Sequence, residues 1–142
     1  MRTRFIQTLK EYIEKEGLTN HKFADMVGIK LSTFYDFLRS DDIMLRNVLK
    51  IVDYLGASLD YFEGKTKNFY CDYKKDYKVD LQAQVKKYLK EKNIPLYRMC
   101  DEIGMSRTNY FRWRDGDCPK YYSIVQMANY FGVSIDEFIG RV

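Results

Sequence analysis

The strongest constraint on the fold is that the sequence of 142 residues repeats itself in one register. Three pairs of glycines lie 76 positions apart without any gap, namely Gly28 and Gly104, Gly56 and Gly132, and Gly64 and Gly140. The same offset pairs identical residues at Tyr12 and Tyr88, Asp25 and Asp101, Ser58 and Ser134, Asp60 and Asp136, and Phe62 and Phe138. Self-similarity in one register marks duplicated structural units. The sequence therefore predicts two copies of one domain, over residues 1–64 and 78–142, with residues 65–77 as a linker.

Within each copy the apolar residues have the spacing of helices. Phe5, Leu9, Tyr12 and Ile13 follow the i, i+4, i+7, i+8 pattern that buries one side of a helix. The first copy then predicts helices over residues 20–27, 31–38 and 45–55 and a last turn over residues 59–62. The second copy predicts helices over residues 80–92, 96–103, 107–114, 121–131 and 135–139. The predicted fold class is all-α, with five helices in each of two tandem domains and no strand.

Residues suited to helix ends stand at the predicted boundaries. Thr19, Ser58, Ser106 and Ser134 are placed as N-caps, because their hydroxyls can accept from the first free N–H groups of a helix. Gly28 stands where a chain that leaves a helix needs a positive φ. These signals support the predicted helix boundaries.

The linker is polar but rich in aromatic rings. It contains Phe69, Tyr70, Tyr73 and Tyr77 within KTKNFYCDYKKDY. An extended tether rarely carries so many rings, so we expect part of the linker to pack on a domain.

The mildly basic balance of the chain is unevenly distributed. The net charge is +4, and the pI is near 8.8. Residues 1–64 have nine Lys and Arg against ten Asp and Glu, whereas residues 78–142 have eleven against eight, and the linker has four against two. Basic charge favours nucleic-acid partners, and it is concentrated in the linker and the second copy.

No pattern for catalysis, metal binding or cofactor binding is present in the sequence. Cys71, Cys100 and Cys118 form no CxxC pair and have no histidine at ligand spacing, so neither a zinc site nor a disulfide framework is predicted. His21 is the single histidine and lacks a neighbouring nucleophile pattern. We expect a non-enzyme without cofactor, metal or evident small-molecule substrate.

The sequence also favours a cytoplasmic protein without membrane contact. No stretch approaches the roughly 20 apolar residues that span a bilayer. The start, MRTRFIQTLKEYIEKEG, has acidic residues too early for a signal peptide.

Two segments resemble the Cro/repressor-type (XRE-like) helix-turn-helix family, namely LTNHKFADMVGIKLSTFYDFL and IPLYRMCDEIGMSRTNYFRWR. The family pattern has a small residue inside its second helix, a glycine in the turn and apolar residues that hold its third helix. Ala24, Gly28 and Phe37 fit this pattern in the first copy, as do Cys100, Gly104 and Trp113 in the second. The segments YLGASLDYFEGK and YFGVSIDEFIGR are similar to the family's ending. The resemblance covers nearly the whole chain and implies two lambda-repressor-like domains in which Phe37 and Trp113 anchor the third helix.

The resemblance implies that the start of the third helix contacts bases in the major groove, while the start of the second helix and the following loop contact phosphates. In the second copy the base-contacting positions hold Ser106, Arg107, Thr108, Asn109 and Arg112. Arginine pairs with guanine and asparagine with adenine through two hydrogen bonds each. Arg98 and Lys120 are the candidate phosphate contacts. Leu96 replaces the glutamine that is common at the start of the second helix, so Tyr97 is a candidate substitute.

The matching positions of the first copy are less suited to DNA. Lys30 can contact a phosphate, Ser32 or Thr33 can contact bases, and Asn20 has an amide near the start of the second helix. The carboxylate of Asp36 is repelled by phosphates unless it accepts a hydrogen bond from cytosine. Whether the first copy binds DNA or a protein stays open.

Two functions are consistent with these residues. The first is a transcription regulator of the repressor type that binds double-stranded DNA sequence-specifically, either as a homodimer or as an intramolecular pseudo-dimer. The alternative is a protein-interaction module, such as an antirepressor, an antitoxin or a mobile-element inhibitor, that reuses helix-turn-helix domains; the acidic first copy favours it.

Overall fold

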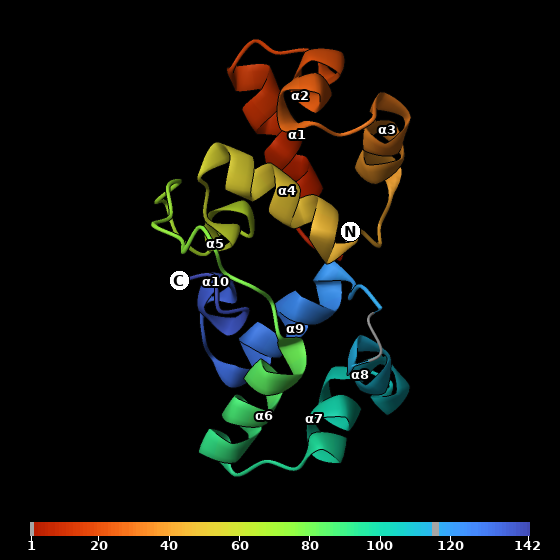
Figure 1. Cartoon of the computed structure of the whole chain (residues 1–142), viewed down its shortest axis with the longest axis vertical. Coiled ribbons are helices and arrows are strands. Elements are labelled where there is room, and N and C mark those ends of the chain that lie inside the picture. The colour runs from red at the N-terminus through yellow and green to blue at the C-terminus, as the bar shows by residue number, and fades with distance from the viewer. Residues whose placement is uncertain (1, 115–116) are drawn as a thin grey trace. The chain divides into compact units, whose positions relative to one another are not determined.

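The computed structural model describes residues 2–114 and 117–142, which form ten helices and no strand (Figure 1). The chain is therefore all-α, as predicted. It divides between Cys71 and Asp72 into two compact units, which we call the first unit and the second unit. None of the described helices is both long enough and apolar enough to cross a membrane.

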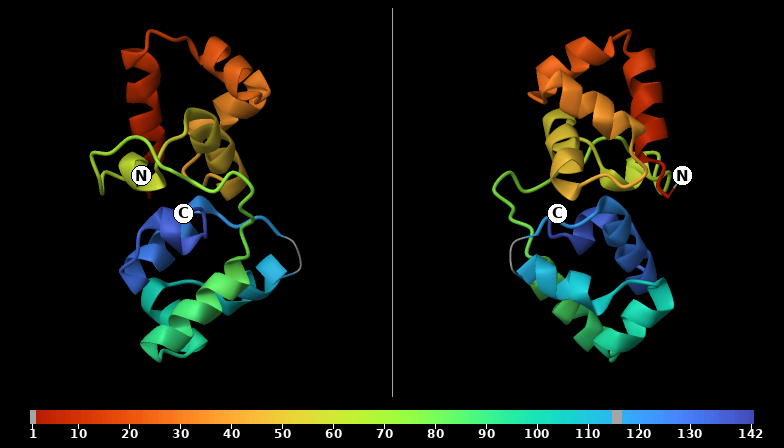
Figure 2. Two further views of the ribbon diagram at one scale, coloured as in Figure 1. Left: turned by 60° about the vertical axis from the view of Figure 1, so that its left-hand side comes forward. Right: turned by 90° about the vertical axis from the view of Figure 1, so that its right-hand side faces the viewer.

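Five helices build each unit. The first unit contains α1 (Phe5–Lys15), α2 (Asn20–Val27), α3 (Leu31–Arg39), α4 (Leu45–Leu55) and α5 (Leu59–Phe62). The second unit contains α6 (Leu81–Lys92), α7 (Leu96–Ile103), α8 (Arg107–Arg114), α9 (Tyr121–Phe131) and α10 (Ile135–Phe138). Each helix of the second unit begins 76 positions after its counterpart, so the repeat in the sequence is also a repeat of secondary structure. Figure 2 shows each unit as a cluster of short helices around its own centre.

The helix boundaries deviate from the prediction by one residue at three ends. The helix α3 extends to Arg39 instead of Leu38, and α10 ends at Phe138 instead of Ile139. Asp80 is not helical but is the N-cap of α6, because its side chain accepts a hydrogen bond from the Ala83 N–H at 3.1 Å. A short polar side chain at this place satisfies an N–H group that has no partner within the helix.

The predicted caps are present. Thr19 Oγ1 accepts from the Lys22 N–H at 3.1 Å, and the Ser58 and Ser134 hydroxyls accept from Tyr61 and Glu137 at 3.4 and 3.0 Å. Gly28 and Gly104, which end α2 and α7, have φ angles of +84° and +71°. Because L side chains rarely adopt this conformation, glycine lets the chain turn directly into α3 and α8.

Aromatic rings form the core of the first unit around Phe5. The Phe5 ring stacks on Phe62 of α5 with 4.6 Å between centroids and meets Phe37 of α3 edge-on at 6.1 Å. Phe23 of α2 packs on Phe34 of α3 at 5.6 Å. The helix α3 is thus held by buried rings from α1 and α2.

The core of the second unit has fewer rings next to α8. Tyr88 of α6 stacks on Phe131 at 5.4 Å and packs on Phe138 at 5.7 Å, away from α8. Tyr110 is the buried aromatic residue of α8. Leu81 stands in the second unit where Phe5 stands in the first, so the ring contact between Phe5 and Phe37 has no counterpart at positions 81 and 113.

The prediction that Trp113 is a core anchor like Phe37 is confirmed only in part. Phe37 is buried, whereas Trp113 is half-buried and meets the buried Tyr110 edge-on at 6.4 Å.

One long-range hydrogen bond is repeated in both units. Thr8 Oγ1 of α1 donates to the Phe62 carbonyl at 3.0 Å, and Gln84 Nε2 of α6 donates to the Phe138 carbonyl at 2.6 Å. Thr8 and Gln84 are 76 positions apart, as are the two acceptors. Each bond ties the first helix of a unit to its last helix.

Part of the aromatic segment between α5 and α6 packs, as expected. The Phe69 ring stacks on Tyr12 at 5.4 Å, and the Cys71 N–H donates to the Gly56 carbonyl at 2.9 Å, so this part belongs to the first unit. In the second unit the Lys74 N–H donates to the Arg141 carbonyl at 2.8 Å. The division between units thus falls inside the segment predicted as a linker.

Arg141 is a buried cation that the sequence did not predict. Its guanidinium forms an ion pair of 2.8 Å with Asp136, and the two side chains are 0% and 5% exposed. The guanidinium also lies 4.3 Å from the centre of the Tyr73 ring. These contacts hold residues 73 and 141 of the second unit together.

Candidate functional site

The orientation of α8 is fixed by its contacts with α6 and α7. The Met105 N–H donates to the Cys100 carbonyl at 2.8 Å, which closes the turn between α7 and α8. Tyr110 is buried, and its carbonyl accepts a hydrogen bond of 3.2 Å from Gln82 of α6. With Tyr110 facing inward, the opposite face of α8 is directed to solvent (Figure 1).

That outward face presents four exposed residues, namely Arg107, Thr108, Phe111 and Arg112. Residues four positions apart on a helix are neighbours, so Arg107 lies beside Phe111, and Thr108 lies beside Arg112. Two guanidinium groups, a hydroxyl and an aromatic ring therefore share one surface, which we call the α8 face.

The other two candidate residues at the start of α8 are Ser106 and Asn109. Ser106 is exposed, but its hydroxyl accepts a hydrogen bond from the Thr108 N–H at 3.2 Å. Asn109 is half-buried. Among the described side chains of α8, Arg107 and Arg112 therefore offer exposed cationic donors, beside the exposed hydroxyl of Thr108.

The candidate phosphate contacts of the second unit lie at the starts of α7 and α9. Tyr97 and Arg98 are exposed in the first turn of α7, and Lys120 is exposed at the N-cap position of α9. The helix α7 contacts both α8 and α9. The start of a helix also favours anions, because its free N–H groups carry partial positive charge.

Arg98 is already engaged by a carboxylate. Its Nε lies 3.0 Å from Glu102, and the two side chains are 60% and 46% exposed. A hydrogen bond from the Tyr130 phenol of α9 and the pairing with Arg98 lower the pKa of the Glu102 carboxyl. A phosphate would have to compete with Glu102 for Arg98.

In the first unit the candidate residues Lys30, Ser32 and Thr33 are exposed around the start of α3, and Asn20 is half-buried at the start of α2. Asp36, on the following turn of α3, lies 3.4 Å from Arg39 in an exposed ion pair. The structure thus places the polar residues of both units on corresponding helices.

The two units differ in charge at corresponding positions of these helices. Arg107 and Arg112 of α8 correspond to Leu31 and Asp36 of α3, and Lys120 corresponds to Met44. Three cationic positions of the second unit are thus apolar or acidic in the first. The surface of the second unit is the better match for an anionic partner.

A groove of about 220 Å³ lies between α3 and α4 of the first unit. It is lined by Thr33, Asp36, Phe37, Ser40, Asp42, Ile43, Met44 and Asn47. Its carboxylates disfavour phosphates, and its apolar floor is suited to a side chain of a protein.

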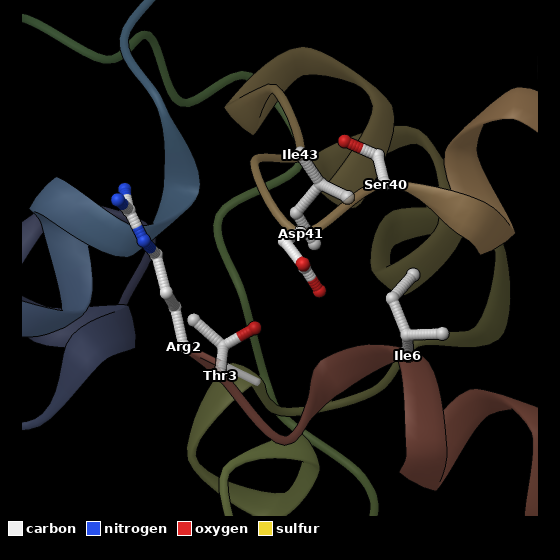
Figure 3. Close-up of a pocket in the computed structure, with 6 residues that line it drawn as sticks. All are labelled: Arg2, Thr3, Ile6, Ser40, Asp41 and Ile43. Atoms are coloured by element: carbon white, nitrogen blue, oxygen red, sulfur yellow. The ribbon is translucent and has the colours of Figure 1, made fainter.

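A smaller pocket of about 10 Å³ lies between the N-terminal segment and the loop after α3 (Figure 3). It is lined by Arg2, Thr3, Ile6, Ser40, Asp41 and Ile43. Figure 3 shows the Asp41 carboxylate pointing into the space between Thr3 and Ile6, while the Arg2 side chain extends away from it. This volume is about that of one water molecule. The pocket therefore marks where the N-terminal segment packs and has no room for a larger ligand.

Sequence reasoning missed two exposed aromatic residues. Tyr35 on α3 and Phe111 on α8 are 41% and 44% exposed and correspond at the 76-residue offset. A signal was available, because each follows a buried aromatic residue, Phe34 or Tyr110, and a helix turns the next position by about 100° away from the core.

Cys100 is buried where α7 packs on α8, which matches its assignment as the small residue of the second helix. Burial raises the pKa of its thiol. Among the described residues, no three His, Cys, Asp or Glu side chains gather where they could hold a metal ion.

No family model, curated protein or solved structure matches the chain. The functional interpretation therefore depends on the residues and their geometry.

Proposed function

We propose that this chain is a sequence-specific regulator of the repressor type that binds double-stranded DNA through two tandem helix-turn-helix domains. In this proposal α7 and α8 form the helix-turn-helix of the second domain, and the α8 face enters the major groove. The helices α2 and α3 form the corresponding pair in the first domain.

The observation that carries the proposal is the composition of the α8 face. Arg107 and Arg112 are exposed on the outer side of a helix whose inner side is held by Tyr110. Arginine is the commonest side chain for specific contact with guanine, through O6 and N7 in the major groove. A helix fits the width of that groove, so both guanidinium groups could reach base edges.

The remaining surface of the second unit supports the same proposal. Lys120 and Tyr97, at the starts of α9 and α7, could contact the backbone on either side of α8. Such contacts fix the position of the helix and add affinity that depends on salt.

A second candidate function is favoured by the first unit, where Asp36 and Asp42 line an open groove. Carboxylates at the positions expected to approach phosphates weaken DNA binding. A protein partner with a cationic or apolar side chain would fit this groove better. The first unit would then act as an interaction module beside a DNA-binding second unit, or the whole chain would be such a module.

Selection of binding sites from a pool of random duplexes tests the proposal with the full chain. We expect an enriched motif that contains at least one guanine, and we expect the Arg112→Ala variant to lose selectivity at one position of it. Two half-sites about ten base pairs apart would indicate that two reading helices act together. A pool that stays random with the wild-type protein would contradict the proposal and favour the protein-interaction module.

A further inference from the structure

The first helices of the two units, α1 and α6, have opposite charges at corresponding positions. Residues 5–16 and 81–92 contain five charged residues each, and the sign of the charge is reversed at four of the five positions. Two lysines against three glutamates give the segment of the first unit a charge of −1, whereas four lysines against one glutamate give its counterpart +3. The reversed pairs are Glu11 and Lys87, Glu14 and Lys90, Lys15 and Glu91, and Glu16 and Lys92, while Lys10 and Lys86 are alike.

The structure places these charges on the solvent side of each helix. Glu11 and Glu14 of α1 are exposed, and so are Lys87 and Lys90 of α6. Residues three apart lie on one side of a helix and are separated by about 4.5 Å along its axis. We call Glu11 and Glu14 the acidic α1 face, and Lys87 and Lys90 the basic α6 face. The buried residues of the same helices are Phe5, Ile6, Leu9, Ile13, Leu81, Val85 and Tyr88.

Neither face is neutralised within its own unit. Glu11 accepts a hydrogen bond of 3.5 Å from the uncharged amide of Gln7, and the Lys87 ammonium lies 5.1 Å from the centre of the Tyr88 ring. In the part of the chain that the structure describes, no ion pair involves a side chain of either face. An ion pair with a partner would therefore not have to replace one that the single chain already contains.

We propose that the chain associates with a second copy of itself by packing the acidic α1 face of one chain against the basic α6 face of the other. Because each chain carries one face of each sign, two identical chains are complementary. The charges have the same spacing on both helices, so Glu11 and Glu14 can pair with the two lysines at the same time. The inference concerns a surface other than the α8 face and does not depend on binding to DNA.

A second copy of the chain is the occupant that accounts for both faces. Nucleic acid would account for the lysines of α6, but it would repel the glutamates of α1. A basic protein partner would account for the glutamates alone. Complementary charge between two surfaces favours the correct partner and orientation. Exposed ion pairs are individually weak, each strengthening association by up to about fivefold, so we expect an association that depends strongly on salt.

Sedimentation velocity of the full chain at low and at high salt measures this association. At low salt the mass should exceed the 17.0 kDa of one chain and rise with protein concentration, and high salt should reduce it because salt screens exposed charges. The variant Lys87→Glu with Lys90→Glu makes both faces acidic and should raise the dissociation constant at least about tenfold. Arg46→Glu with Lys50→Glu, at exposed positions of α4, changes the net charge equally and is the matched control, for which no change is expected.

Reversal of the other face gives a second variant and a rescue. Glu11→Lys with Glu14→Lys makes both faces basic and should also prevent self-association. Mixed with the variant whose two lysines are reversed, it should form a complex, because each face again meets the opposite charge. All four substitutions in one chain should restore self-association, which keeps the test informative if one of the double variants does not fold.

Three results would overturn the inference. They are a wild-type chain that remains a monomer at every concentration and salt, an association that persists unchanged in both double variants, and folded double variants that fail to associate with each other. The selection of duplexes tests the proposed function separately, so either proposal can fail while the other stands.

Discussion

Replacing Arg141 with methionine would leave a buried carboxylate without its cation. The Asp136 side chain is 5% exposed, and its ion pair with Arg141 is 2.8 Å long. Removal of one partner of such a pair costs about 3 to 5 kcal/mol, because the remaining charge stays buried without its ion-pair partner. The substitution also removes the contact with the Tyr73 ring, so the free energy measured for Arg141→Met includes the loss of both interactions.

The matched control is the same substitution in an exposed pair. Arg98→Met breaks the ion pair with Glu102, in which both side chains are largely solvated, and should cost at most about 1 kcal/mol. A double variant, Arg141→Met with Asp136→Leu, removes both buried charges and should be more stable than Arg141→Met alone.

Urea unfolding of the full chain, followed by circular dichroism, measures these free energies. Hydrogen exchange should locate the loss of protection of Arg141→Met in residues 72–142 and leave the first unit unchanged. If Arg141→Met were no less stable than Arg98→Met, the buried pair would not stabilise the second unit more than an exposed pair does.

Four further results are expected. Phe37→Ala should cost about 3 to 5 kcal/mol in urea unfolding, and Trp113→Ala clearly less, because only Phe37 is buried; equal losses would contradict the difference in burial. Gly104→Ala should cost about 1 to 2 kcal/mol through its positive φ alone, since no atom lies within 4 Å of an added Cβ; an unchanged midpoint would refute this. Cys100 should be alkylated more slowly at neutral pH than the other two cysteines, as measured by peptide mass spectrometry, and Cys100 as the first thiol to react would refute this. Because the thiol pKa of Cys100 is raised in the folded protein, the free energy of unfolding should fall as the pH rises above the ordinary thiol pKa. Asp36→Ala should leave duplex affinity unchanged or slightly tighter at low salt, measured by anisotropy, and a sequence-dependent loss would instead make Asp36 a base contact.

The helices and their order could be predicted because several boundaries have a local cause. The cap at Thr19 and the positive φ at Gly28 depend on residues within one turn of the helix end. Because the sequence is repeated, each helix was predicted twice, and a wrong helix boundary in one copy would have differed from the boundary predicted in the other.

Features that depend on contacts between distant residues were not predictable in the same way. Phe37 is buried and contacts Phe5 of another helix, whereas Trp113 is half-buried and the position equivalent to Phe5 holds Leu81. Arg141 is buried and contacts Asp136 and Tyr73, although arginine is normally expected in solvent.

The sequence could predict which residues belong to the candidate site, but it could not predict which of their side chains are exposed. The resemblance placed Arg107, Arg112 and Asn109 on one helix, but burial decides which of them a partner can reach, and Asn109 is half-buried. Phe111 was overlooked because an aromatic residue in an apolar pattern is usually assigned to the core.

The central claim is that the α8 face reads the sequence of duplex DNA, and Arg112→Ala tests it most directly. Anisotropy with the selected duplex and a scrambled duplex of equal length, each at two salt concentrations, compares this variant with wild type. We expect Arg112→Ala to weaken binding to the selected duplex by about 1 to 3 kcal/mol more than to the scrambled duplex, because a base contact is lost. Lys92→Ala, a loss of the same charge at the end of α6, should affect both duplexes alike and less. A wild-type protein that binds both duplexes equally, with Arg112→Ala indistinguishable from it, would contradict the account.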